Sequence, residues 1–596
     1  MTPSNLHSAW ARLFVSSLAT AGVRHAVLSP GSRSTPLALA LAAEGRIRTT
    51  VVIDERAAGF VALGIARTTA SPSLLVCTSG TAGAHYYPAV IEASESEIPL
   101  VVVTADRPWE LQRCGASQTI DQTRLFGAFV RHAAQIGEPA PHLEALRAVA
   151  RIAGRVVMQA RGPHPGPVHV DMAFRKPLEP VAVAARESWE DDVEALLARA
   201  AVTTFAGLPR ASDEALAALV ARVADSKSTL VVAGPTRAVE RSRMAHAIAA
   251  FVRAAGATLL AEPTSAARFG AAPEDAGHPC DPVVGSGSFV SAVDPDLLIE
   301  IGAPPVSAAW SKLASRGTSE RVVLGAPGHA DPHGTATLAI DGDAPDLLLR
   351  AAHALAEVAD ASARARRASS SRARTLGGAA ARATSRALDA APFSEASIAR
   401  TVIDALPSGA VLLVGNSGVV RELDAWGGAG TSAIEVHHQR GAAGIDGLIA
   451  GASGARFATD VARPVVVLLG DVSAVHDLGG LVVAREASAP LVIVVVHNDG
   501  GRIFEQLPLG CTHVDPDVIE RCFVTPHGIS PSAVAASLGI ASSRVETGLA
   551  FRAALQEALA APRATVVEAV VPPRDAAART RAVRQSIDRA IAEAAR

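Results

Sequence analysis

The chain has 596 residues, which suits about three domains of ordinary size, and 49% of them are hydrophobic. Its net charge of −3 gives no overall basic field for nucleic acid, and its five cysteines, without a Cys-x-x-Cys pair, argue against a disulfide framework or a structural zinc site. No apolar stretch approaches the roughly 20 residues that span a bilayer, and the N-terminus lacks a basic segment followed by an apolar core. We therefore expect a soluble, unexported protein of the reducing cytoplasm.

Apolar runs of strand length alternate with helix-sized segments in three successive blocks of the chain. Such alternation is typical of α/β domains in which helices cover a mainly parallel sheet. We therefore predict an α/β fold with three doubly wound parallel sheets, one in each of the blocks 1–185, 200–355 and 392–580.

Within these blocks we expect the strands to be the apolar runs at residues 25–28, 51–53, 74–78, 100–103, 168–170, 229–234, 297–302, 321–324, 464–469 and 491–496. A helix is expected over residues 476–488, between the last two strands. Residues 356–391, rich in Ala, Arg and Ser, are interpreted as a linker or an exposed helix. Residues 581–596 are interpreted as a solvated helical tail.

Two polar motifs of the third block indicate a metal site. Gly470-Asp471-Val472-Ser473 ends one apolar run, and Asn498-Asp499-Gly500 ends the next. Because ligands of such βαβ units bind at the carboxyl ends of the strands, we expect Asp471 and Asn498 to lie there together. A carboxylate, an amide oxygen and a backbone carbonyl near Gly500 suit an octahedral Mg²⁺ that also binds diphosphate oxygens. Either motif alone also fits a simple helix cap.

Together, at this spacing, the two motifs resemble the thiamine diphosphate fingerprint. The resemblance implies that Asp471, Asn498 and the Gly500 carbonyl hold Mg²⁺, or Mn²⁺ in its place. It also implies that Gly470 and Ser473 lie against the cofactor.

Glu55 is the candidate for the second element of a thiamine enzyme. It follows the run Val51-Val52-Ile53 and starts a segment rich in alanine and glycine. Such an enzyme needs a carboxylate that hydrogen-bonds the aminopyrimidine ring and promotes formation of the thiazolium ylid. A glutamate here also fits a preference for helix N-termini, but the fingerprint favours Glu55 as the catalytic group, in an apolar pocket.

Seven stretches along the chain single out one family of thiamine enzymes. They are SPGSRSTPL (29–37), TSGTA (78–82), TADRP (104–108), GASQ (115–118), GNSGVVR (415–421), RGAAGIDG (440–447) and GGRIF (500–504). Through them the chain resembles the MenD family, 2-succinyl-5-enolpyruvyl-6-hydroxy-3-cyclohexene-1-carboxylate synthase, from end to end.

The resemblance implies a transferase of menaquinone biosynthesis. In that reaction 2-oxoglutarate is decarboxylated on the cofactor and the four-carbon carbanion adds to isochorismate. The resemblance also implies a pyrimidine-binding domain in block 1–185, a central domain in block 200–355 and a diphosphate-binding domain in block 392–580.

The expected substrate residues suit such substrates, because arginine forks bind carboxylates bidentately. Any single arginine also fits a surface charge or a structural ion pair. By position, the resemblance places Arg33, Arg107, Arg421, Arg440, Ser32, Gln118 and Ser417 at the substrate. It places Ile445 under the bent cofactor, and Ile503, Phe504 and Leu507 in an apolar wall beside the bound intermediate.

Some positions depart from the family. Ala308-Ala309 stands where basic residues commonly contact substrate, and His497 precedes the metal asparagine where asparagine is frequent. Two alternatives therefore stay open: another thiamine diphosphate-dependent 2-oxo acid decarboxylase or carboligase, and a non-catalytic relative that binds the cofactor. Product analysis with and without isochorismate separates the synthase from the first alternative, and cofactor binding without release of CO₂ from 2-oxoglutarate would favour the second.

Glu55 and Asp471 fall in different blocks, so the two halves of the cofactor site must meet across an interface. The resemblance implies a homodimer or homotetramer with paired sites. We expect small-molecule substrates, and neither nucleic acid nor membrane insertion.

Overall fold

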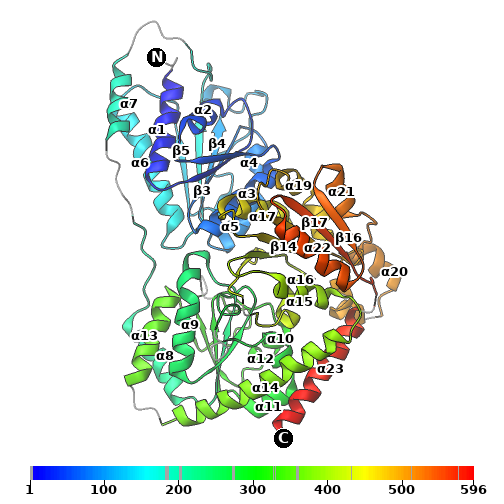
Figure 1. The fold of residues 1–596 in the computed structure, drawn as a ribbon. Helices are drawn as coiled ribbons and strands as arrows, with labels where there is room; N and C mark the ends of the chain where they lie inside the picture. The colour runs from blue at the N-terminus through cyan, green and yellow to red at the C-terminus, as the bar shows by residue number, and fades with distance from the viewer. Residues whose placement is uncertain are drawn as a thin grey trace. The chain divides into compact units, whose positions relative to one another are not determined.

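The computed structural model of the chain describes residues 5–181, 187–199, 205–271, 276–325, 328, 330–357, 361–430, 432–511, 513–574 and 576–596. The chain divides into two compact units. Unit 1 comprises residues 1–208, 439–460 and 477–484, and unit 2 comprises residues 209–438, 461–476 and 485–596. Figure 1 shows the helices and strands of both units.

Unit 1 is built on a sheet of six parallel strands in the order β2-β1-β3-β4-β6-β5. The strands are β1 (His25–Leu28), β2 (Arg48–Val51), β3 (Ser73–Cys77), β4 (Leu100–Asp106), β5 (His132–Ile136) and β6 (Pro167–Ala173). Both β3 and β4 are buried along their whole length, and Ser73 of one strand pairs with Leu100 of the other. Central strands of a parallel sheet are covered on both faces, which is why their sequences are continuous apolar runs.

Helices cover both faces of this sheet. The helices of unit 1 are α1 (Leu6–Thr20), α2 (Thr35–Ala43), α3 (Glu55–Thr69), α4 (Ala82–His85), α5 (Tyr87–Glu95), α6 (Leu143–Arg161), α7 (Ser188–Ala198), α17 (Leu448–Ala458) and α19 (Leu478–Ala484). Phe14 of α1 and Val149 of α6 share one apolar core with Val101 and Val103 of β4, and both helices run alongside the sheet in Figure 1. The helix α3 packs on β1, β3 and β4 as well as on α5.

The helices α3 and α17 approach each other backbone to backbone. A Cβ atom at Gly64 would lie 2.0 Å from the carbonyl oxygen of Gly451, and one at Gly454 would lie 2.1 Å from that of Val61. Both distances are far below a van der Waals contact, so only glycine fits at these two positions. Because α17 comes from residues 439–460, a late part of the chain completes unit 1.

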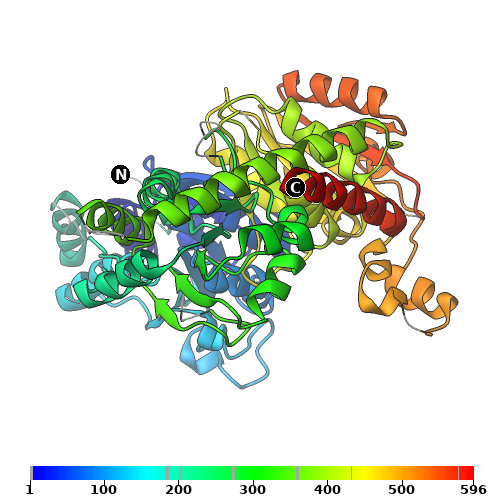
Figure 2. The same cartoon turned by 90° about the horizontal axis from the view of Figure 1, so that it is seen from below.

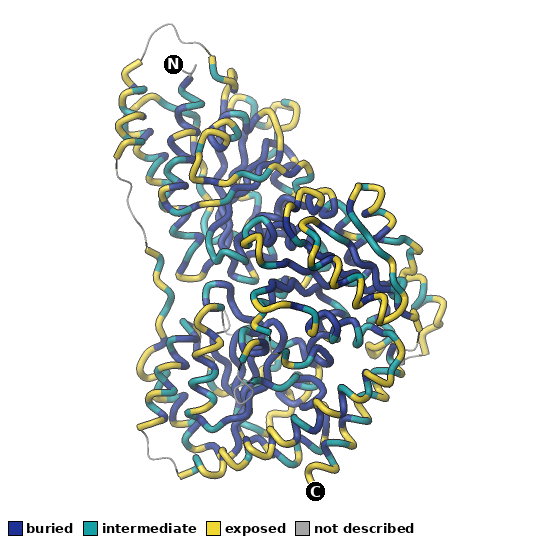
Figure 3. The backbone as a smooth tube through the Cα atoms, viewed as in Figure 1, coloured by how far each residue is buried: buried dark blue, intermediate teal, exposed yellow. Residues whose placement is uncertain are grey.

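Unit 2 contains two parallel sheets. The five-stranded sheet has the order β11-β10-β9-β7-β8, and the six-stranded sheet has the order β13-β12-β14-β15-β17-β16. The strands are β7 (Thr229–Ala233), β8 (Thr258–Ala261), β9 (Leu297–Ile301), β10 (Glu320–Leu324), β11 (Leu338–Ile340), β12 (Val411–Val414), β13 (Glu435–His438), β14 (Val465–Gly470), β15 (Leu491–His497), β16 (Ala541–Val545) and β17 (Ala564–Val570). The central strands of both units are buried, as the dark tube of Figure 3 shows.

The helices of unit 2 include a long pair at its surface. This pair is α14 and α23. The helices of the unit are α8 (Asp213–Asp225), α9 (Arg241–Ala255), α10 (Cys280–Val284), α11 (Gly287–Val293), α12 (Ala308–Ala314), α13 (Ala344–Glu357), α14 (Ala363–Asp389), α15 (Glu395–Ala405), α16 (Gly418–Trp426), α18 (Asp471–His476), α20 (Pro516–Ile519), α21 (Pro531–Ser537), α22 (Gly548–Ala560) and α23 (Ala576–Ala595). The C-terminal helix α23 packs on α14 and α11, as Figure 2 shows for the green and red helices. Leu376 of α14 and Ile587 and Ile591 of α23 are buried in one shared core.

The predicted α/β class is confirmed, because the strand pairs of all three described sheets are parallel. Two local predictions are wrong. The expected strand at 51–53 is shifted to β2, and the side chain of Ile53 is 79% exposed. The expected helix over 476–488 is two helices, α18 and α19, on either side of Asp477, whose carboxylate accepts the backbone N–H groups of Ile449 and Ala450.

The block bounds remain predictions. The positions 185 and 200 lie outside the described residues, as do residues 358–360 of the segment interpreted as a linker or exposed helix. Of that segment, residues 363–389 form α14, which has a buried face. Among the described residues, no helix combines the length and apolar character needed to cross a membrane.

Candidate active site

Residues just after β3 hold two of the predicted arginines in unit 1. The Thr78 hydroxyl accepts the backbone N–H of Arg33 at 3.1 Å, and the Arg33 guanidinium donates to the carbonyl of Phe174 at 2.7 Å. Arg107, directly after β4, donates from Nη1 to the hydroxyl of Ser79. The loops that follow three neighbouring strands thereby bring Arg33 and Arg107 together.

The electrostatics of this pair favour an anion. Arg33 is buried, and its Nε has no hydrogen-bond partner among the described residues. Burial and, after it, the charge of Arg107 lower the pKa of Arg33. Since two guanidiniums repel each other and a carboxylate accepts from both, a bound carboxylate would relieve the strain of placing them here.

Gln118 belongs to the same group of residues. Its Nε2 donates to the Ser79 carbonyl at 3.1 Å, and the Ser79 hydroxyl donates to the Gln118 carbonyl at 3.2 Å. The backbone of Gln118 is left-handed, with φ of 55°. Ser32 is exposed in the loop before α2, next to Arg33.

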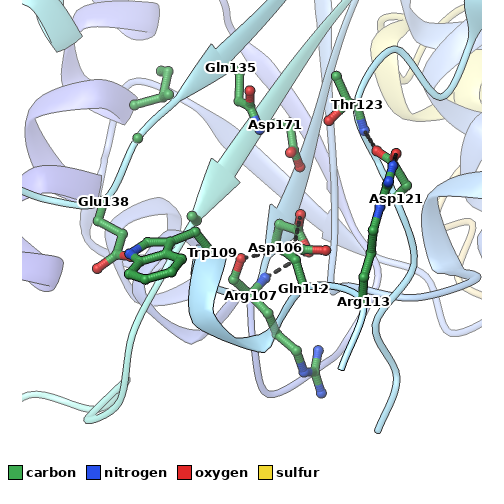
Figure 4. A pocket seen from close by; sticks show the side chains of 13 residues that line it. Asp106, Arg107, Trp109, Gln112, Arg113, Asp121, Thr123, Gln135, Glu138 and Asp171 are labelled. Atoms are coloured by element: carbon green, nitrogen blue, oxygen red, sulfur yellow. Dashed lines mark hydrogen bonds and ion pairs between the residues drawn. The ribbon is translucent and has the colours of Figure 1, made fainter. Parts of the chain in front are cut away.

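A cavity of about 400 Å³ opens beside Arg107 (Figure 4). Asp106 and Asp171 line it, and Asp171 accepts hydrogen bonds from the Thr104 hydroxyl and Gln122 Nε2, both at 2.9 Å. Burial and, after it, the charge of Asp106 raise the pKa of Asp171 to about 7. The two carboxyl groups therefore share a proton near neutral pH.

Glu55 is the first residue of α3 and is half-buried. The preceding Asp54 caps the helix by accepting the backbone N–H of Arg56 at 2.9 Å. Burial and, more weakly, the charge of Glu55 raise the pKa of the Cys77 thiol and of the Tyr86 hydroxyl, both buried. Glu55 thus lies at the edge of an apolar, water-poor part of unit 1.

Glu92 of α5 fixes the loop that carries Arg440 and Ile445, which are both half-buried. Its carboxylate accepts the backbone N–H groups of Gly441 at 3.1 Å and Ala442 at 2.8 Å. The same carboxylate pairs with Arg67 at 3.2 Å, and Glu92 and Arg67 are both buried.

In unit 2, Asp471 joins the ends of β14 and β15. Its side chain is buried, and Oδ2 accepts the backbone N–H of Gly500 at 2.9 Å. Burial raises the pKa of Asp471. A divalent cation bound to this carboxylate would offset the cost of keeping it charged.

Two histidines that the sequence patterns did not mark as site residues lie beside Asp471. His527 Nε2 is 3.5 Å and His497 Nε2 is 3.8 Å from Asp471 Oδ2. His497 Nδ1 lies 2.7 Å from Glu568 Oε1, and this bond raises the pKa of His497. His527 Nδ1 accepts the backbone N–H of Ile529 at 3.0 Å, so the neutral ring carries its proton on Nε2, facing Asp471. The pair supplies positive or hydrogen-bond-donating character beside the carboxylate.

Asn498 and Gly500 complete the predicted metal donors. Asn498 Nδ2 donates to Glu395 Oε1 at 3.1 Å, which leaves its Oδ1 for another partner. Gly500 has φ of 125°, and a Cβ there would lie 2.3 Å from the carbonyl oxygen of Val524. A carboxylate, an amide oxygen and a glycine carbonyl are the oxygen donors that Mg²⁺ takes, so the residues present fit such an ion.

The remaining predicted residues also lie in unit 2. Ser417 has φ of 66° directly before α16, and its carbonyl accepts from the Arg421 guanidinium at 2.6 Å. Ile503 and Phe504 are half-buried in a short 3-10 helix, and Leu507 is exposed. Gly470 and Ser473 flank Asp471 at the end of β14 and in the first turn of α18.

The predicted residues are therefore divided between the units. Unit 1 has the substrate residues Ser32, Arg33, Arg107, Gln118 and Arg440, and the cofactor residues Glu55 and Ile445. Unit 2 has Ser417, Arg421 and the metal and diphosphate residues. Within each unit the structure groups them as described, and their individual roles stay predictions.

Comparison with known proteins defines the class. The chain matches the family described as thiamine pyrophosphate enzyme, N-terminal TPP binding domain, over residues 9–125, and the corresponding C-terminal TPP binding domain over residues 434–569. A crystal structure from Mycobacterium smegmatis, described as a candidate thiamin diphosphate-dependent enzyme, has a TM-score of 0.66 at 19% identity, covering 96% of this chain and 100% of that chain. This likeness shows the same fold, and the matched domains make the chain a thiamine pyrophosphate-dependent enzyme.

Curated relatives then give the family. The 2-succinyl-5-enolpyruvyl-6-hydroxy-3-cyclohexene-1-carboxylate synthase of Sorangium cellulosum is 46% identical over 90% of this chain and 88% of its own length. The synthases of Myxococcus xanthus and Halorubrum lacusprofundi are 40% and 37% identical, each over 89% of this chain and over 89% and 87% of their own lengths. The chain belongs to the 2-succinyl-5-enolpyruvyl-6-hydroxy-3-cyclohexene-1-carboxylate synthase family, as its sequence motifs predicted.

Proposed function

We propose that this chain decarboxylates 2-oxoglutarate and adds the resulting four-carbon unit to isochorismate, giving 2-succinyl-5-enolpyruvyl-6-hydroxy-3-cyclohexene-1-carboxylate in menaquinone biosynthesis. The observation that supports this substrate choice most directly is the pair of adjacent guanidiniums in unit 1. The Nε of Arg33 is unpartnered among the described residues, and burial and, after it, the charge of Arg107 lower the pKa of Arg33. A site that takes only a neutral or a small monocarboxylate substrate does not need such a pair.

Thiamine diphosphate, when bound, supplies an electron sink for the carbon–carbon bond that breaks and the one that forms. In the proposed site Glu55 would hydrogen-bond the aminopyrimidine ring of the bound cofactor. Asp471, Asn498 and the Gly500 carbonyl hold Mg²⁺ or Mn²⁺, whose charge offsets that of the diphosphate. Gly470 and Ser473 would lie against the diphosphate and Ile445 under the bent cofactor, and the side chains of Ile503, Phe504 and Leu507 would form an apolar wall beside the bound intermediate.

The substrates are held by charge and by hydrogen bonds. Arg33 and Arg107 receive carboxylate oxygens, with Ser32 and Gln118 as neighbouring hydrogen-bonding groups. Arg421, Arg440 and Ser417 are the further groups that we assign to substrate. Glu92 acts indirectly, because it holds the backbone next to Arg440.

We also propose that the active enzyme is a homodimer or a homotetramer. Glu55 belongs to unit 1 and Asp471 to unit 2, and the cofactor must reach both. Val51 and Ile53, just before Glu55, are 60% and 79% exposed, which fits a surface covered by a second copy. The cytoplasmic location predicted from the sequence remains a prediction.

Consumption of 2-oxoglutarate by the purified protein with thiamine diphosphate and Mg²⁺, with and without isochorismate, tests the proposed function. We expect turnover that depends on isochorismate, with the succinyl adduct identified by mass. Decarboxylation without the adduct would move the substrate assignment elsewhere, starting with Ala308-Ala309 at the first turn of α12. Cofactor binding without release of CO₂ would favour a non-catalytic relative.

A further inference from the structure

The amide of Asn498 can serve a cation in only one of its two orientations. An amide oxygen binds a cation, whereas the NH₂ group carries two donor hydrogens and repels it. Because the two orientations have nearly the same shape, something must select between them. We propose that Glu395, held by Arg579 of the C-terminal helix, is the positioning residue that turns the Asn498 oxygen toward the metal. This inference rests on the metal site of the proposed function.

The contact between the two side chains fixes the orientation. Asn498 Nδ2 lies 3.1 Å from Glu395 Oε1. A carboxylate can only accept a hydrogen bond, so the NH₂ group and not the oxygen must face it. The oxygen of Asn498 then faces away from Glu395 and is free to bind a cation.

Glu395 lies at a position in the fold where a carboxylate is favoured. It is the first residue of α15, where the positive end of the helix dipole favours an anion, and its side chain is only 11% exposed. The nearby Glu422 is different: burial and, after it, the charge of Glu395 raise the pKa of Glu422 to about 8. Of these two carboxyl groups, the one that contacts Asn498 is the one at the helix N-terminus.

Arg579 ties this carboxylate to the C-terminal helix. Its Nη2 lies 3.7 Å from Glu395 Oε2, the oxygen that does not bind Asn498, and its Nη1 donates to the Arg574 carbonyl at 3.1 Å. The helix α23 is in turn anchored by Ile587 and Ile591 in the core that it shares with α14. The chain of contacts from α23 through Arg579 and Glu395 reaches Asn498, so the last helix of the protein supports the metal site.

The test is a Mn²⁺ titration of the full-length protein in the presence of thiamine diphosphate, followed by electron paramagnetic resonance. Partners in the outer shell of a metal site typically contribute 10–100-fold to metal affinity. We expect Glu395→Ala to weaken Mn²⁺ binding by about 10–100-fold. Glu395→Gln can donate as well as accept, so it no longer excludes the wrong orientation of Asn498, and its Mn²⁺ affinity should lie between those of Glu395→Ala and the wild type. Arg579→Ala should have a smaller effect in the same direction, and Arg581→Ala, at an exposed position of α23, should have none.

A double-mutant cycle distinguishes positioning from general damage to the fold. If Glu395 acts through Asn498, the double variant Glu395→Ala with Asn498→Ala binds Mn²⁺ no more weakly than Asn498→Ala alone. Additive losses, or wild-type affinity in Glu395→Ala when Asn498→Ala is weakened, would overturn the role of Glu395. Unchanged Mn²⁺ binding in Asn498→Ala would instead overturn the proposed metal ligand. Should Glu395→Ala not fold, the comparison of Arg579→Ala with Arg581→Ala decides, and equal affinities would overturn the inference.

Discussion

The six-stranded sheets of the two units have the same strand order, yet the predicted ligand-binding residues that follow their strands differ in charge. Both follow the same sequence of neighbours, β2-β1-β3-β4-β6-β5 in unit 1 and β13-β12-β14-β15-β17-β16 in unit 2. In unit 1 the loops after β1 and β4 carry Arg33 and Arg107, which suit anions. In unit 2 the loops after β14 and β15 carry Asp471 and Asn498, which suit a cation. The same topology is thus used twice, and the loop residues after the strands decide which charge each sheet suits.

The strongest test of this division is Glu55→Ala in unit 1. General acid–base groups typically contribute about 10²–10⁴-fold to rate, so we expect kcat to fall by that order while Mn²⁺ and thiamine diphosphate still bind. Steady-state kinetics together with cofactor titration by intrinsic fluorescence measure both quantities. Full activity would remove Glu55 from the mechanism.

The matching test in unit 2 is Asp471→Asn. A direct ligand should contribute more than its outer-shell partners, so we expect Mn²⁺ affinity to fall by more than about 100-fold, and cofactor retention with it. Asp389→Asn, an exposed carboxylate at the end of α14, is the control. If Asp471→Asn kept the metal and lost only substrate affinity, the assignment of the cation to this sheet would be wrong.

A smaller effect is expected from Arg107→Lys in unit 1. Lysine keeps the charge but loses the planar fork, and charge-assisted hydrogen bonds contribute about 1.5–3 kcal/mol. We expect KM for 2-oxoglutarate to rise about 10–100-fold, with a smaller change in kcat. Arg124→Lys, at an exposed position of the same unit, should leave KM unchanged. An unchanged KM in Arg107→Lys would exclude bidentate binding by this arginine.

The smallest effect concerns the pH dependence of stability. The raised pKa of Asp171, about 7, means that the folded state keeps a proton that the unfolded state releases near pH 4. Its contribution to stability is thus fully present below about pH 4 and is lost as the pH rises to about 7, by at most about 1.4 kcal/mol per pH unit. Asp171→Asn imitates the protonated carboxyl. In thermal unfolding, the stability of the variant relative to that of the wild type should therefore increase from pH 5 to pH 8. A difference that does not change with pH would contradict the shared proton.

The sequence was most informative where function depends on residues near strand ends. The apolar runs before Asp471 and Asn498 predicted two parallel strands, and the bond between Asp471 and the Gly500 N–H shows that their ends meet. The motifs around Arg33 and Arg107 likewise predicted residues that the structure brings together through Thr78 and Ser79. Local patterns sufficed there because strand ends of a parallel sheet lie at one edge.

Contacts between distant segments were not predictable from such patterns. His527 reaches Asp471 from a loop before α21, and Glu395 reaches Asn498 from the start of α15. A lone histidine or a glutamate at a helix start has an ordinary structural explanation, so neither carries a signal of its own. The break between α18 and α19 lies at Asp477, whose carboxylate accepts backbone N–H groups at the start of α17, far away in the sequence.

The glycine contact between α3 and α17 has a consequence for how the chain can be made. During translation α3 is synthesised early, whereas α17 is synthesised only after residues 209–438. Until then the side of α3 that carries Gly64 has no α17 to pack against. A fragment ending at residue 208 would never acquire α17. We therefore do not expect the N-terminal part of this chain to fold as an autonomous domain when it is expressed alone.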